Sequence, residues 1–130
     1  MKIADYVKLS YEEASIITQE NTLTRIFTKL GYESAIITLG KEGVAYKEEK
    51  RIFKIQAPLV EEIDPTGAGD VFITAFLGKL IETGEIDYAV AFGIALASHA
   101  VTTKGAEPLP KVNYKEIADE LLSTKRKIET

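Results

Sequence analysis

The chain has 130 residues, enough for one domain with a hydrophobic core but not for two. Its 45% hydrophobic and 28% charged content predicts a globular protein, and its net charge of −4 argues against a nucleic-acid-binding surface. The absence of cysteine and the single histidine argue against disulfides, thiolate metal sites and a Ser-His-Asp triad. The apolar runs are too short to span a membrane and no signal peptide is evident, so we expect a cytoplasmic enzyme or binding domain.

Residues 1–55 alternate between strand and helix patterns. The predicted elements are a strand at 3–9, helices at 10–20 and 23–30, and strands at 35–39, 44–47 and 51–55. Ser10 and Glu13 have the spacing of a capping box, which predicts the start of the first helix. We expect Thr22 or Thr24 to cap the second helix and Gly31 to end it.

Residues 68–130 are predicted to be mainly helical. The expected helices run from Ala68 to about Glu82, from Ile86 to Val101, and onward from a cap at Asn113. Gly84 and Gly105 follow the first two of these helices, as C-terminal glycines do. The charged tail Ser123–Lys127 is predicted to be a solvated, fraying end without a role.

The order of these elements predicts the fold class. A small, mainly parallel sheet covered by helices, with a β-hairpin at 44–55, indicates an α/β domain that occupies residues 1–130 as one unit. The strands at 3–9 and 35–39 are expected to be parallel and linked by a right-handed crossover.

The stretch Asp64–Asp70, with the sequence Asp-Pro-Thr-Gly-Ala-Gly-Asp, is the strongest candidate for a functional site. Its two glycines let the backbone approach a ligand, and a helix that begins there directs its unpaired N–H groups at the loop. Such a place attracts anions, of which phosphate is the usual one. Asp70 falls in the first helical turn, where a carboxylate can accept a proton from a hydroxyl. The pattern indicates phosphoryl transfer, with a plain turn into a helix as the alternative.

A second glycine-containing loop, Thr38–Gly43, follows the predicted strand at 35–39. Ligands of α/β proteins bind at the carboxyl ends of parallel strands. Two glycines three positions apart allow close backbone approach to a ligand. A simple strand-turn-strand connection explains the same residues and is the more common meaning of such a loop on its own.

Both loops resemble signatures of one family. Asp64–Asp70 and the small-residue helix after it look like the second signature of the ribokinase-like (PfkB) carbohydrate kinases. The loop Thr38–Gly43 resembles the family's Thr-x-Gly-x-x-Gly turn beside the nucleotide, and the two loops have the family's order. Lys8–Glu13 resembles its Asn-x-x-Glu element, with Ser10 in place of the Asn, although the capping box accounts for the same residues. Thr102–Ala106 is similar to the turn that lies by the nucleotide and a monovalent cation.

This resemblance implies the carboxyl-terminal part of a three-layer α/β/α kinase that transfers the γ-phosphoryl group of ATP to a hydroxyl of a sugar or nucleoside. Asp70 would be the base, and the N–H groups of Gly67, Ala68 and Gly69 would stabilise charge on the transferring group. The implied nucleotide-binding residues are Thr38, Leu39, Gly40, Lys41, Glu42, Gly43, Gly69, Gly105 and Ala106. The implied metal ligands are Glu13 for magnesium, and Asp64 and Thr66 for a monovalent cation such as potassium.

The resemblance covers nearly the whole chain but only the carboxyl-terminal half of the family. The half without a counterpart supplies most of the sugar pocket in relatives. Three hypotheses follow: a catalytic half of a kinase, a non-catalytic nucleotide-binding domain, or an assembly module. In the last, a second copy or a partner chain would cover the strand edge at Ile3–Leu9. Neither nucleic acid nor membrane is expected as a partner.

Overall fold

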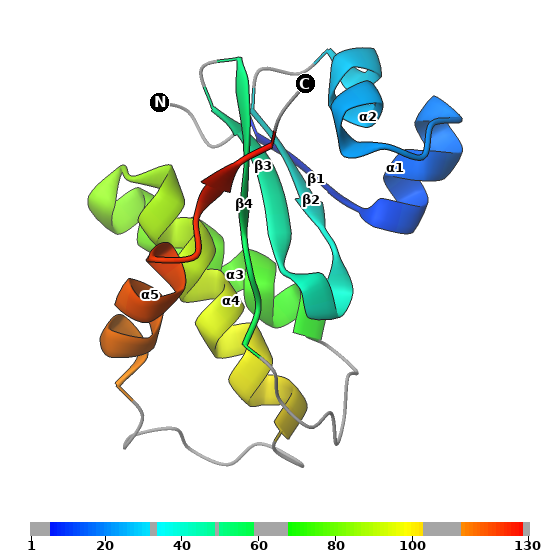
Figure 1. Cartoon of the computed structure of the whole chain (residues 1–130). Coiled ribbons are helices and arrows are strands. Elements are labelled where there is room, and N and C mark those ends of the chain that lie inside the picture. Colours follow the sequence, from blue (N-terminus) through cyan, green and yellow to red (C-terminus); the bar gives the residue numbers. More distant parts are fainter. Residues whose placement is uncertain (1–5, 32–33, 49, 59–67, 103–112, 129–130) are drawn as a thin grey trace.

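The computed structural model describes residues 6–31, 34–48, 50–58, 68–102 and 113–128 (Figure 1). Its strands are β1 (Tyr6–Ser10), β2 (Ser34–Thr38), β3 (Val44–Glu48), β4 (Arg51–Ile55) and β5 (Arg126–Lys127). Its helices are α1 (Tyr11–Thr18), α2 (Leu23–Leu30), the short 3-10 helix η2 (Gly40–Glu42), α3 (Ala68–Thr83), α4 (Ile86–Thr102) and α5 (Tyr114–Leu122). Of the described helices, none has the length and hydrophobicity that a membrane crossing requires.

Within the described residues the predicted elements are confirmed to within a few residues, because their signals are local, while residues 3–5 of the first predicted strand lie outside the described residues. Ser10 Oγ accepts the Glu13 N–H at 3.1 Å and Glu13 Oε1 accepts the Ser10 N–H at 2.9 Å, so the capping box of α1 is present. Thr22, rather than Thr24, caps α2. Gly31 ends α2 with a φ of 68°. Gly105 lies outside the described residues.

The sheet is mixed, and its described strands follow the order β1-β2-β3-β4-β5. β1 and β2 are parallel, as predicted, whereas the pairs β2–β3, β3–β4 and β4–β5 are antiparallel. The prediction of a mainly parallel sheet is therefore wrong. The crossover through α1 and α2 carries the chain back to the end of the sheet at which β1 began, so β2 runs parallel to β1. The tight turns before and after β3 reverse the chain direction, so β3 is antiparallel to both of its neighbours.

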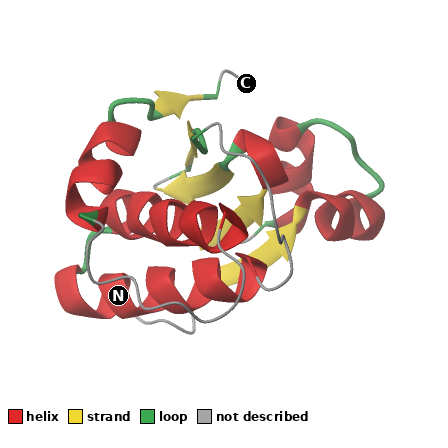
Figure 2. Cartoon of the chain, turned by 90° about the horizontal axis from the view of Figure 1, so that it is seen from below, coloured by secondary structure: helices red, strands yellow, loops and turns green. Residues whose placement is uncertain are grey.

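Alternation along the strands sends side chains to two separate buried clusters. Ile36 and its cross-strand partner Tyr46 face α3, α4 and α5, whereas Ile37 and its partner Ala45 face α1 and α2. Figures 1 and 2 show these two groups of helices on opposite sides of the sheet. The predicted α/β/α layering is thus confirmed, and the carboxyl end of β2 lies between the layers.

The tail is ordered, which overturns the prediction of a fraying end at Ser123–Lys127. Arg126 and Lys127 form β5, which pairs with Lys54 and Phe53 of β4. The N–H of Ile128 then donates to the carbonyl of Ile52 at 2.8 Å. The charged composition suggested solvation, but Ile128 anchors the segment by packing against the cluster beneath α1 and α2.

Candidate active site

The loop after β2 is a tight turn that requires its glycines. Leu39 N–H donates to the Gly43 carbonyl at 2.8 Å, and η2 lies between them. Gly40 and Gly43 have φ values of 61° and 107°, which side chains disfavour. A Cβ on Gly43 would also collide with the carbonyl oxygen of Ile55. The turn is thus built so that backbone, not side chain, lines the space beside it.

That space is a cavity of about 170 Å³ at the carboxyl end of β2. It brings together segments that are distant in sequence, and its lining residues are Thr38, Gly40, Gly43, Val44, Ala57, Gly69, Phe72, Ile94, Ala97 and Ser98. Four residues that the sequence assigned to the nucleotide, Thr38, Gly40, Gly43 and Gly69, therefore share one cavity. Most of the remaining wall is apolar and comes from α3 and α4, whose side chains a local motif does not reveal.

The start of α3 lies at one end of this cavity. Gly69 and Asp70 occupy the first turn of the helix and are both exposed. The first N–H groups of a helix have no partner within the helix, and at the start of α3 they lie beside an exposed carboxylate. Of the other predicted residues near this turn, Ala68 begins α3, while Asp64, Thr66 and Gly67 lie outside the described residues, as do Gly105 and Ala106.

Lys8, which the sequence motif did not single out, lies beside the first turn of α3. Its ammonium nitrogen lies 3.8 Å from the position that a Cβ would occupy on Gly69. Lys8 makes none of the ion pairs found among the described residues. The signal that could have found it is strand alternation, since Leu9 packs toward α1 and α2 and its neighbour must point toward α3.

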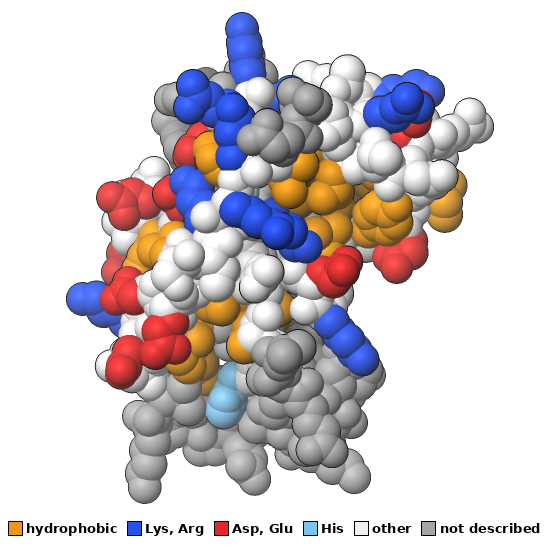
Figure 3. All heavy atoms as spheres, in the orientation of Figure 1, with side chains coloured by type: hydrophobic (Ala, Val, Ile, Leu, Met, Phe, Trp, Pro, Cys, Tyr) orange, Lys and Arg blue, Asp and Glu red, His pale blue; other side chains and the backbone are white. Residues whose placement is uncertain are grey.

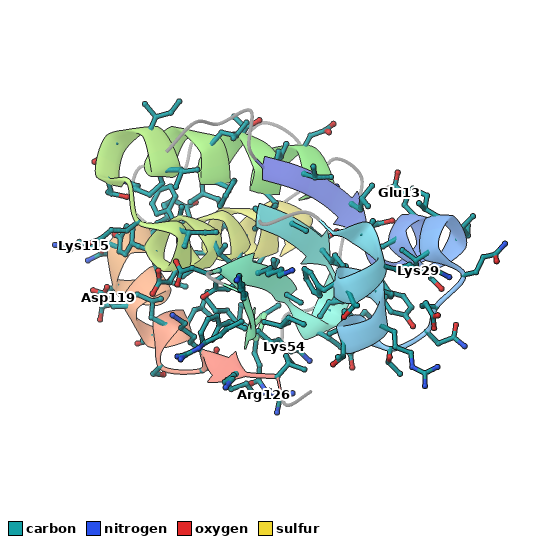
Figure 4. The ribbon with its side chains drawn as sticks, turned by 90° about the horizontal axis from the view of Figure 1, so that it is seen from above. Glu13, Lys29, Lys54, Lys115, Asp119 and Arg126 are labelled. Carbon is teal, nitrogen blue, oxygen red and sulfur yellow. The ribbon has the colours of Figure 1, made fainter. Side chains whose placement is uncertain are left out.

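The predicted magnesium ligand Glu13 is engaged in the capping box. The hydrogen bond from the Ser10 backbone lowers the pKa of the Glu13 carboxyl below its ordinary value, and the bond with the Ser10 side chain lowers it further. Figure 4 shows Glu13 at the α1 end of the molecule. Within the described residues there is no group of three carboxylate or histidine side chains suited to a metal ion. The residues described do not by themselves form a metal site.

A second cavity, of about 550 Å³, lies on the α1 and α2 side of the same turn. Its lining residues are Ser10, Tyr11, Glu12, Leu23, Thr38, Leu39, Gly40, Glu42 and Lys54. Leu39 and Glu42, predicted to bind nucleotide, line this cavity rather than the one beside Gly69, and Lys41 lines neither. In Figure 3, hydrophobic side chains gather over α1, α2 and the neighbouring strands, with basic side chains beside them.

Comparison with known proteins identifies the family. The sequence profile of the pfkB family carbohydrate kinases matches residues 1–112. The chain belongs to the pfkB carbohydrate kinase family. This pfkB-family chain is 33% identical to a ribokinase of Haemophilus influenzae over 115 residues, which cover 82% of the chain and 38% of that protein. It is 37% identical to a ribokinase of Bacillus subtilis over 104 residues, which cover 80% and 35% of the two chains.

Part of each of several solved sugar-kinase structures has the same fold as this pfkB-family chain. A fructokinase of Vibrio cholerae with fructose, ADP and calcium bound matches with a TM-score of 0.72 and 27% identity, over 78% of this chain and 36% of that one. An Arabidopsis thaliana ribokinase complexed with ribose and ATP matches with a TM-score of 0.71 and 26% identity, over 91% and 40%. The ribokinase-like fold is thereby confirmed. The chain spans well under half the length of these relatives.

Proposed function

We propose that this chain is the nucleotide-binding and catalytic part of an ATP-dependent kinase that phosphorylates a hydroxyl of a sugar or nucleoside. The observation that carries the proposal is the convergence of Thr38, Gly40 and Gly43 with Gly69 in one cavity, with Asp70 in the adjoining helical turn. Membership of the pfkB family and the sugar kinases among its relatives support this choice of reaction.

The cavity fits part of a nucleotide rather than all of it. Its volume of about 170 Å³ is smaller than the roughly 300–1,000 Å³ of sites that enclose a drug-sized ligand. The apolar wall formed by Val44, Phe72 and Ile94 suits a flat base. The phosphates would then extend from the cavity toward the start of α3, where Gly69 lies.

In this proposal Asp70 accepts the proton of the acceptor hydroxyl as its oxygen forms a bond to the γ-phosphorus. The bond from that phosphorus to the β,γ-bridging oxygen breaks, and ADP leaves with the electron pair. The N–H groups at the start of α3, together with the Lys8 ammonium, stabilise the charge on the transferring group. Magnesium and a monovalent cation are the metal ions that the family resemblance implies for this reaction.

Calorimetry with ATP and magnesium, followed by an ADP-release assay against a panel of sugars and nucleosides, tests the proposal. We expect ATP binding in the wild type and in Asp70→Asn, and loss of any turnover by a factor of about 10² or more in that variant alone. Asp119→Asn is the matched control, because Asp119 is exposed on α5 (Figure 4). Absence of ATP binding, or full turnover in Asp70→Asn, would refute the assignment.

A non-catalytic assembly module is the second candidate, and the surface around β1 favours it. β1 is one of the two edge strands of the described sheet. On the neighbouring helix α1, Ile16 and Ile17 are 77% and 64% exposed. A second copy of this chain, or a partner that supplies the remainder of a sugar kinase, would cover such a surface. Sedimentation of the chain alone distinguishes self-association from a monomer, and the ADP-release assay distinguishes either from an active kinase.

A further inference from the structure

One wall of the cavity beside Gly69 is a short piece of backbone that follows β4. A Cβ on Gly43 would lie 2.9 Å from both the Cα of Gln56 and the nitrogen of Ala57. Gln56 and Ala57 therefore cross directly over Gly43, and Ala57 lines the cavity with it. A small displacement of this segment would change the width of the cavity, because Gly43 has no side chain to keep the two apart.

This wall is held by a residue from the other end of the chain. The N–H of Gln56 donates to Oγ1 of Thr124 at 3.0 Å, across 68 positions in sequence. The same hydroxyl donates its proton to the carbonyl of Leu121 at 2.6 Å, which fixes its direction. Thr124 thus links the end of α5 to the cavity wall through both of its hydrogen-bonding functions.

Adjacent tail residues keep Thr124 in place. Lys125 Nζ lies 3.0 Å from Asp87 Oδ2 on α4, and 4.3 Å from the ring centroid of Phe53 on β4. β5 continues this contact by pairing with β4. Because α4 also contributes Ile94, Ala97 and Ser98 to the cavity, the tail is bonded to two of the elements that line it.

We propose that Thr124 is a positioning residue, which fixes the Gln56–Ala57 wall and so sets the shape of the cavity. That the occupant of the cavity is a nucleotide rests on the function proposed above. Thr124 does not line the cavity, and its direct link to the cavity wall is the hydrogen bond with the Gln56 N–H.

The test uses the full chain with Thr124→Val, which keeps the shape of the side chain and removes the hydroxyl. Thr124→Ser is the conservative variant, since it retains the hydroxyl. Thr83→Val is the matched control: Thr83 Oγ1 also donates to a carbonyl, of Lys79 at 2.9 Å, and accepts an N–H, of Glu85 at 3.2 Å, but at the far end of α3. Amide hydrogen exchange by NMR measures the wall, and calorimetry with magnesium and ADP measures the cavity.

We expect the Gln56 amide to exchange at least tenfold faster in Thr124→Val, since Gln56 is exposed and its N–H loses its acceptor. Affinity for ADP should fall about fivefold, with both properties restored in Thr124→Ser and unchanged in Thr83→Val. Unchanged exchange at Gln56, or an unchanged ADP affinity despite faster exchange, would overturn the proposal.

The two proposals fail in different ways. If the wild type binds no ADP, the nucleotide function is refuted, and the positioning role is then judged by exchange at Gln56 and Ala57 and by the NMR shifts of Val44, Ile94 and Ala97 in the cavity. If those shifts move in Thr124→Val and return in Thr124→Ser, Thr124 positions the wall. If they do not move, it does not.

Discussion

Lys8 of β1 directs its ammonium group at the first turn of α3, 3.8 Å from where a Cβ on Gly69 would lie. Both partners are positive, since the start of a helix carries a partial positive charge. Two such groups at this distance favour an anion placed against both of them. A phosphate group would meet this requirement, and Lys8 would then contribute to its binding.

Removing the charge of Lys8 should weaken the binding of ATP. In Lys8→Met, which keeps the length of the side chain, we expect affinity to fall about tenfold, the value of one charge-assisted hydrogen bond. Calorimetry with ATP and magnesium measures it. Lys29→Met is the control, because Lys29 is exposed on α2 (Figure 4) and lies 3.9 Å from Glu20. Equal affinity in the two variants would remove Lys8 from the site.

Substitution of Gly43 should be costly for stability. In Gly43→Ala a Cβ must displace the backbone after β4, at a φ of 107°, so we expect a loss of about 3 kcal/mol in the free energy of unfolding. Urea unfolding followed by circular dichroism measures it. Gly78→Ala is the control, because Gly78 lies in α3 and an added Cβ there would have nothing within 4 Å. This variant should be more stable than the wild type by about 0.5–1 kcal/mol in the free energy of unfolding. Similar unfolding midpoints would contradict the proposed close contact.

The capping box of α1 predicts a pH dependence. Because the folded-state pKa of Glu13 is lowered by its hydrogen bonds with Ser10, its stabilising effect is complete above its unfolded pKa and is lost as the pH falls through the folded pKa. In Ser10→Ala the Glu13 carboxyl should titrate at a higher pH than in the wild type, while Ser10→Thr should resemble the wild type. NMR titration of the side-chain carboxyl carbons measures these midpoints. A midpoint that does not change in Ser10→Ala would mean that the cap does not hold the carboxylate in solution.

If copies of the chain associate, the exposed Ile16 and Ile17 of α1 should lie in the contact between them. A double variant, Ile16→Asp with Ile17→Asp, should then dissociate at concentrations where the wild type is associated. Lys115→Asp serves as the control, since Lys115 is exposed on α5 and separate from this surface (Figure 4). Sedimentation velocity measures all three proteins. A wild type that stays monomeric at every concentration would exclude association between copies. The surface around β1 would then require a partner other than a second copy.

Those features that depend on neighbouring residues could be predicted from the sequence. Ser10 with Glu13, Gly31 after α2 and Asn113 before α5 each act within a single turn, and all are found where expected. The tail is different. Its order comes from pairing with β4 and from the contact of Ile128 with a cluster formed by earlier elements. A charged segment carries no local sign of such a distant partner.

The candidate site divides in the same way. The glycines of the two loops could be recognised because a tight turn and a close approach leave few alternatives to glycine. Gly40 and Gly43 of the first loop and Gly69 of the second line one cavity, as expected for two motifs of a single site. Strand alternation places Lys8 on the α3 side of the sheet, but its proximity to Gly69 could not be recognised, nor could the bond of Thr124 with Gln56, because each joins residues far apart in the chain. Because Leu39 and Glu42 are neighbours of Gly40 and Gly43 in the sequence, the sequence predicts all four in one site. In the folded turn Leu39 and Glu42 instead line the cavity on the α1 and α2 side.

The strands occur in the sheet in the same order as in the chain, which bears on how the protein forms during synthesis. β2, β3 and β4 can each pair with the strand made just before it. The outer edge of β4 has no such neighbour until Arg126–Lys127 is made, after α3, α4 and α5. An unpaired strand edge is a template for the strand of another molecule. The nascent chain therefore exposes this edge until β5 is made, and pairing with β5 then shields part of the edge from other molecules.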